Sequence, residues 1–129
     1  MNASEALGFC KAWLTAWTGN QPDTLISFYE EDAYYQDPAK PMGLRGKNAI
    51  LPYFVKLLSL NPNWTWRALE VFPTKQGFTL KWEANIPIRD TMVAEKGLDI
   101  VEVKNGKITR NEVYFDRTEI LKAMTGRNL

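Results

Sequence analysis

Residues 28–38 read FYEEDAYYQDP, and the second half of this stretch is short, aromatic and ended by a proline. Such a segment is typical of a β-strand, because aromatic residues favour strands and a proline interrupts strand pairing. Asp37 lies at the end of the segment, directly before Pro38. An aspartate before a proline commonly starts a turn, and it is equally a candidate for acid–base chemistry at the end of a strand. Both interpretations of Asp37 stay open.

Helices are predicted around this strand. Asn2 and Glu5 have the spacing of a capping box, and apolar residues then recur with helical periodicity until Gly19. Pro22 is typical of the first turn of a helix. The predicted helices span residues 2–19, 20–29 and 46–61.

Everything after residue 61 is predicted to form strands, except for a short helix at the C-terminal end. Asn105-Gly106 is a strong hairpin signal, and Asp116 with Glu119 has the spacing of a second capping box. The predicted strands span residues 64–72, 78–88, 97–104 and 107–115. We therefore expect one α+β domain over residues 1–129. Three N-terminal helices cover the concave face of a curved antiparallel sheet, and a pocket lies between the layers.

The composition excludes several classes of protein. The 129 residues include 16 basic and 15 acidic side chains, so the net charge of +1 gives no basis for nucleic-acid binding. No apolar run is long enough for a membrane span. There is no histidine, which excludes Ser-His and Cys-His catalysis and histidine-bound metals. We expect no metal and no cofactor, and acid–base chemistry that relies on carboxyls.

The lone Cys10 cannot form an internal disulfide, and it lies on the apolar stripe of the first predicted helix. We interpret it as a small buried filler. A single thiol and the lack of a secretion signal predict a cytoplasmic protein.

Three stretches together resemble a known family. Residues 28–38 match the FYxxDAxxxDP pattern of NTF2-like proteins, and residues 43–50, GLRGKNAI, continue it. Residues 105–116 resemble the last hairpin of the SnoaL-like polyketide cyclases and the ketosteroid-isomerase-like branch. The resemblance covers nearly the whole chain. It implies a cone-shaped domain that binds a small molecule, and it does not decide which reaction, if any, is catalysed.

Asp99 is the second candidate carboxyl. In the predicted strand it shares one face with Val101 and Val103, and no other charge lies on that face. A carboxyl on a buried face must be paired, hydrogen-bonded or protonated. The resemblance implies that Asp99 is a neutral hydrogen-bond donor and Asp37 the general base. Tyr35 lies on the same strand face as Asp37 and is expected to supply a hydroxyl.

The partner of Asp99 depends on the register of the last hairpin. A two-residue turn at Asn105-Gly106 pairs Asp99 with Glu112, whereas a three-residue turn with a bulge pairs it with Asn111. We favour the second register, which the resemblance supports. It places Asn111, Val113 and Phe115 on the pocket face.

The pocket wall is expected to be aromatic and to suit a flat, largely apolar or aromatic ligand. The predicted ligand-binding residues are Trp13, Trp17, Phe54, Trp64, Trp82, Asn111, Val113 and Phe115. One tyrosine of the steroid isomerases falls near Ala12 or Trp13 and the other falls on Phe54, so their oxyanion hole would be incomplete here. The epoxide-hydrolase branch is set aside, because its catalytic aspartate falls on Val113.

Three function classes therefore remain. The first is an isomerase or cyclase that moves a proton next to a carbonyl, the second a ligand binder without turnover, and the third a protein-interaction module. We also predict a homodimer formed through the outer sheet face. Four apolar side chains are expected on that face: Leu98, Ile100, Ile108 and Tyr114.

Overall fold

One curved, mixed sheet forms the centre of the computed structural model, which describes residues 1–126. Its strands are β1 (Tyr29–Asp37), β2 (Lys40–Arg45), β3 (Thr65–Pro73), β4 (Gly77–Ile88), β5 (Thr91–Lys104) and β6 (Lys107–Tyr114). Their spatial order is β2-β1-β6-β5-β4-β3. Neighbouring strands are antiparallel except β1 and β6, which pair in parallel. The predicted α+β fold is confirmed, with this parallel pair as a difference from the expected sheet.

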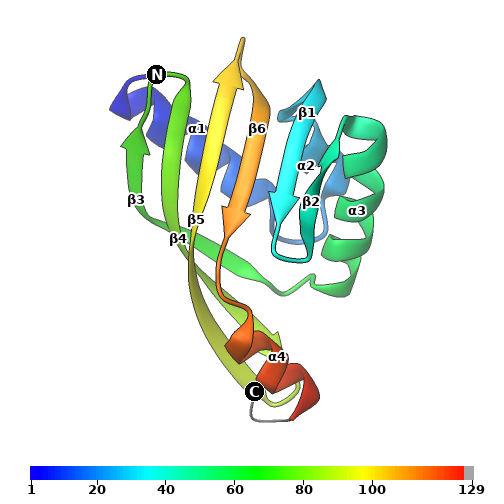
Figure 1. The fold of residues 1–129 in the computed structure, drawn as a ribbon. Coiled ribbons are helices and arrows are strands. Elements are labelled where there is room, and N and C mark those ends of the chain that lie inside the picture. The colour runs from blue at the N-terminus through cyan, green and yellow to red at the C-terminus, as the bar shows by residue number, and fades with distance from the viewer. Residues whose placement is uncertain (127–129) are drawn as a thin grey trace.

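The helices gather on one face and at one end of the sheet (Figure 1). Their bounds are α1 (Ala3–Ala16), α2 (Pro22–Ile26), α3 (Lys47–Leu60) and α4 (Thr118–Thr125). In Figure 1, α1 crosses behind the sheet, α3 stands beside β1 and β2, and α4 lies against the far ends of β4 and β5. No helix among residues 1–126 is both long and apolar enough to cross a membrane.

The two predicted capping boxes have different outcomes. At α1 the box forms, because the Asn2 side chain accepts from the Glu5 N–H at 2.8 Å and the Glu5 carboxylate accepts from the Asn2 N–H at 3.1 Å. At α4 the prediction is wrong. Asp116 Oδ1 accepts from the backbone N–H and the hydroxyl of Thr118, and Arg117 is the N-cap residue.

The edge strand β2 was not predicted, because residues 43–50 were used only for the family resemblance and for the helix that begins at residue 46. Instead the chain turns back after Asp37 and pairs with β1 as far as Arg45. Gly43 allows this pairing, since it adopts a φ of +77° and the Tyr34 side chain occupies the space that a Cβ would need. The strand β1 also begins earlier than predicted, at Tyr29, where it pairs with Ile108 of β6.

Both predicted registers of the last hairpin are wrong. The turn has two residues, with Lys104 opposite Lys107, but a bulge in β6 then shifts the pairing so that Asp99 lies opposite Val113. The predicted face is nevertheless right, because Asn111 and Val113 share it with Asp99. The bulge also reverses the alternation of side chains at Ile108, which is fully buried instead of lying on the outer face.

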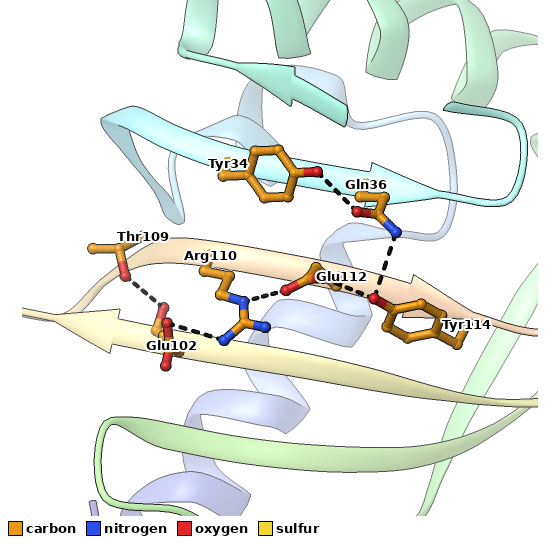
Figure 2. Close-up of polar contacts among 7 residues, drawn as sticks. All are labelled: Tyr34, Gln36, Glu102, Thr109, Arg110, Glu112 and Tyr114. Atoms are coloured by element: carbon orange, nitrogen blue, oxygen red, sulfur yellow. Dashed lines mark hydrogen bonds and ion pairs between the residues drawn. The ribbon is translucent and has the colours of Figure 1, made fainter. Parts of the chain in front are cut away.

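The outer face of the sheet carries a chain of polar contacts (Figure 2). Arg110 bridges Glu102 and Glu112, and Glu112 accepts a hydrogen bond from Tyr114 at 2.7 Å. Gln36 donates to the Tyr114 hydroxyl at 3.5 Å and accepts from Tyr34 at 2.8 Å. Leu98 and Tyr114 remain about half-exposed, so apolar side chains lie among these polar contacts.

Gly97 makes room for the largest side chain of β4. It lies opposite Trp82 in the β4–β5 ladder, and a Cβ on Gly97 would enter the Trp82 indole ring. Trp82 is fully buried, and its ring is held by a hydrogen bond to Asp99 and by contacts with the rings of Trp66 and Phe115. This glycine therefore fixes where the Trp82 ring lies.

We expect Gly97→Ala to lower the free energy of unfolding by about 1–3 kcal/mol, the usual effect of overpacking a core. Urea denaturation measures this change. Gly8→Ala is the matched control, because Gly8 lies exposed in α1 with open space around it. That control should be neutral or stabilising by up to about 1 kcal/mol. Equal effects of the two substitutions would contradict the role assigned to Gly97.

Candidate functional site

A cavity of about 510 Å³ opens between the sheet and the helices. Its lining is mostly apolar and aromatic and comes from α1, α3, α4 and five of the strands. Three charged side chains line it: Asp37, Asp99 and Arg117. The two candidate carboxyls therefore face the same cavity.

The hydrogen bonds of Asp37 occupy both of its oxygens. Oδ1 accepts from the backbone N–H groups of Ala39 and Lys40, each at 2.9 Å. Oδ2 accepts from the hydroxyls of Tyr35 at 2.7 Å and Tyr53 at 2.6 Å. The backbone contacts form the turn that was one of the two interpretations of Asp37. The tyrosine contacts make the same carboxylate part of the cavity wall.

Asp99 lies deeper, at 4 % exposure, and forms no ion pair with any residue in the described part of the chain. Trp82 Nε1 donates to Oδ1 at 2.7 Å, and Asn111 Nδ2 donates to Oδ2 at 3.0 Å. Burial raises the pKa of Asp99 to about 7, against the opposing effect of these two donors, and the negative charge of Asp37 adds to the rise. Asp99 therefore titrates close to neutral pH.

A buried chain of hydrogen bonds leads from α1 to Asp99. Trp13 Nε1 donates to the Tyr29 hydroxyl at 3.3 Å, and Tyr29 donates to Asn111 Oδ1 at 2.8 Å. The amide of Asn111 then donates to Asp99. Each link joins a different element, so the chain fixes α1, β1, β6 and β5 relative to one another.

The predicted site residues divide into two groups. Those that line the cavity are Tyr35, Asp37, Asp99, Trp17, Trp64, Trp82, Val113 and Phe115. Trp13, Phe54 and Asn111 do not line it and are fully buried behind its wall. Trp13 and Asn111 belong to the hydrogen-bonded chain, and the Phe54 ring packs edge-on against Trp17 and Tyr35, with centroids 5.1 Å apart in both pairs.

Sequence reasoning missed Tyr53, which lies one residue before the predicted Phe54. One position on a helix turns a side chain by about 100°, so Phe54 enters the core and Tyr53 reaches Asp37. Burial raises the pKa of Tyr53, the hydrogen bond and charge of Asp37 raise it further, and Arg117 opposes the rise. The available signal for Tyr53 in the sequence was the residue itself, a tyrosine 16 positions after the candidate carboxyl Asp37.

Arg117 and Trp66 were also absent from the predicted site residues, although both line the cavity. Arg117 follows the last strand, in a stretch that was interpreted only as a helix cap. Trp66 packs against Trp82 with ring centroids 4.9 Å apart. Its Nε1 atom is buried and has no hydrogen-bond partner among the residues that the structure describes.

Neither a metal-binding cluster nor the single cysteine offers an alternative chemistry in the region that the structure describes. Residues 1–126 contain no group of three or more Cys, Asp or Glu side chains arranged to hold a metal ion. Cys10 is buried, and burial together with the nearby charge of Asp99 raises the pKa of its thiol to about 12. The thiol therefore remains protonated at neutral pH and is a poor nucleophile.

Several solved structures share this fold. A protein with a ketosteroid isomerase-like fold from Catenulispora acidiphila, crystallised with trimethylamine, is 19% identical with a TM-score of 0.80, over 91% of this chain and 92% of its own. A protein from Kribbella flavida is 22% identical with a TM-score of 0.76, over 97% and 98% of the two chains. TerC, co-crystallised with polyporic acid, is 12% identical with a TM-score of 0.78, over 93% and 98%.

At these identities the structures establish a common fold and no common activity. No curated protein matches the sequence. The SnoaL-like domain matches residues 10–111, which is most of the chain and includes both candidate carboxyls. The chain therefore belongs to the SnoaL-like domain family, within the NTF2-like fold.

Proposed function

We propose that the cavity binds a flat, largely apolar small molecule and that its two carboxyls move a proton on the carbon next to a carbonyl, without a cofactor. The observation that carries this proposal is the pair of carboxyls, Asp37 and Asp99, which open to one apolar cavity and form no ion pair within residues 1–126. The environments of the two groups differ, which is the usual basis for dividing acid and base roles between carboxyls.

Asp99 is assigned the role of neutral hydrogen-bond donor. Trp82 and Asn111 both donate to it, so neither accepts the proton that the neutral carboxyl carries. The cavity is the remaining direction for that proton. A substrate carbonyl there would gain a hydrogen bond that strengthens as negative charge develops on its oxygen.

Asp37 is assigned the role of general base. Its four hydrogen bonds use nearly all the acceptor capacity of a carboxylate. Base action therefore requires one donor to leave, and Tyr53 is the candidate because it is only half-buried whereas Tyr35 is fully buried. A substrate that displaces the Tyr53 hydroxyl would expose Asp37 Oδ2 to its acidic C–H bond.

Deuterium exchange into 2-tetralone tests the proposal without knowledge of the natural substrate. This flat bicyclic ketone has exchangeable protons next to its carbonyl, and NMR follows their loss in D₂O. The protein should accelerate exchange, and Asp37→Asn should reduce the acceleration about 100-fold or more, which is typical for loss of a general base. Asp32→Asn, an exposed aspartate on the same strand, should leave the rate unchanged.

A ligand binder without turnover is the second candidate, and the full set of hydrogen bonds to Asp37 favours it. The two functions give different results in the exchange experiment. If 2-tetralone binds while its exchange stays at the background rate, the protein is a binder and the base role of Asp37 is wrong.

Like the identity of the ligand, the cytoplasmic location stays a prediction.

The pH dependence of stability tests whether Asp99 is neutral in the folded protein. An unfolded aspartate has a pKa of about 3.9, so between about pH 4 and 7 the folded chain keeps a proton that the unfolded chain has lost. Folding stability therefore falls as the pH rises through this window. The unfolding free energy of the wild type minus that of Asp99→Asn should decrease from pH 4.5 to 7.5 and then level off, because only the wild type loses stability through this titration. A difference that grew with pH would show an ionised, stabilised Asp99.

We also propose a homodimer formed through the outer sheet face. Leu98 and Tyr114 are about half-exposed there beside the polar chain of Figure 2, which combines apolar area with satisfied polar groups. The same face has a shallow hollow of about 350 Å³ at Tyr34 and Arg110. Such a face suits a symmetric, self-complementary contact.

Light scattering at micromolar concentration should give twice the mass of one chain, and Leu98→Lys should shift the protein toward monomer. Met92→Lys is the matched control. Met92 is an exposed apolar residue on the same strand β5, but it lies next to the β4–β5 turn, away from Leu98. A wild-type protein with the mass of one chain would refute the dimer.

A further inference from the structure

Arg117 is a cation in the wall of the cavity. It is the one positively charged residue among the described lining residues. Its side chain forms no hydrogen bond or ion pair within residues 1–126. An arginine is always charged and carries five N–H donors, so an unpaired one in a ligand cavity is available to an acceptor from the ligand.

The hydrogen-bonding groups of the cavity are unbalanced in the same direction. Trp66 also lines the cavity, but its Nε1 atom, which has no acceptor among residues 1–126, is buried and therefore out of reach of a ligand. The oxygens of Asp37 and Asp99 already accept hydrogen bonds from protein donors. The protein therefore offers the donors of Arg117 and few unused acceptors, which favours a ligand that brings acceptor oxygens.

Two cationic side chains lie near Tyr53 at one edge of the cavity, beside the Asp37 carboxyl that Tyr53 contacts. Arg117 lies close enough to Tyr53 for its charge to act on that hydroxyl, and Lys40 Nζ lies 5.4 Å from the Tyr53 ring centroid. Leu60 and Met124, which also line the cavity, are the most exposed of the apolar lining residues and mark its opening. The aromatic wall at Trp82 lies deeper. A ligand with an apolar ring system and an acidic end would match this arrangement.

We infer that the ligand carries a carboxylate and that Arg117 binds it, while the ring system lies against the tryptophans. This inference rests on the proposed function and adds a substrate class to it: flat polycyclic ketones with a carboxylate group. Arg117 is accordingly a binding residue that selects acidic over neutral ligands. An arginine suits this task because its planar guanidinium holds both oxygens of a carboxylate.

Two probes that differ in charge at one position test the inference: anthraquinone-2-carboxylate and the neutral anthraquinone-2-carboxamide. Isothermal titration calorimetry gives the Kd of each at pH 7.5. Arg117→Gln should weaken carboxylate binding roughly 10- to 100-fold, as expected for the loss of a charge-assisted hydrogen bond, and should change amide binding less than about threefold. Relative to Arg117→Gln, Arg117→Lys should restore part of the preference for the carboxylate over the amide.

Lys122→Gln is the control, because it removes one positive charge from α4 at a residue that does not line the cavity. Its Kd values should match those of the wild type. If acid and amide bind equally and Arg117→Gln affects them alike, the carboxylate inference is wrong and the cavity remains a site for neutral ketones. If neither probe binds, the proposed ligand class is wrong as well. Carboxylate preference without accelerated exchange of 2-tetralone would support the inference for a binder.

Discussion

The burial of one carboxyl, Asp99, constrains the centre of this fold. A buried carboxyl needs hydrogen bonds, and the two that Asp99 receives come from donors that are themselves positioned by other buried groups. The indole of Trp13 can only donate, so Tyr29 must pass its own proton onward and Asn111 must receive it on its oxygen. The amide of Asn111 is thereby oriented with its NH₂ group toward Asp99. All hydrogen bonds of this series are donated in the same direction, from Trp13 toward Asp99, which lines the cavity.

The same constraint explains which parts of the site could be predicted from the sequence. An aspartate among valines on one strand face indicates a buried carboxyl whatever its partner, so the setting of Asp99 was predictable. Its cross-strand neighbour was not, because one bulged residue in β6 shifts the pairing to Val113, although the favoured partner Asn111 does donate a hydrogen bond to Asp99. Asp37 was predictable for a similar reason, since both its turn and its place at a strand end depend on the adjacent proline.

Residues whose role depends on three-dimensional placement were missed. Tyr53 and Phe54 are neighbours in sequence and point to different surroundings, and only the packing angle of α3 decides which of them meets Asp37. Arg117 follows a strand that ends beside the cavity, and no periodic pattern marks such a connection. The edge strand β2 depends on Gly43 fitting beside Tyr34, a contact between residues that a local interpretation treats separately. The order of helices and strands, by contrast, is local information and was largely recovered.

The position of β6 between β1 and β5 has a consequence for folding. The two ends of the sheet, β2-β1 on one side and β5-β4-β3 on the other, are joined only through this strand, which is the last one in the chain. During synthesis the first half of the protein has no partner for the free edge of β1 until residues 107–114 have left the ribosome. Contacts of such long sequence separation form slowly, and unpaired strand edges attract other chains in the meantime. The pairing of β6 with β1 and β5 therefore completes the cavity, and it also ends the period in which this protein is most prone to aggregate.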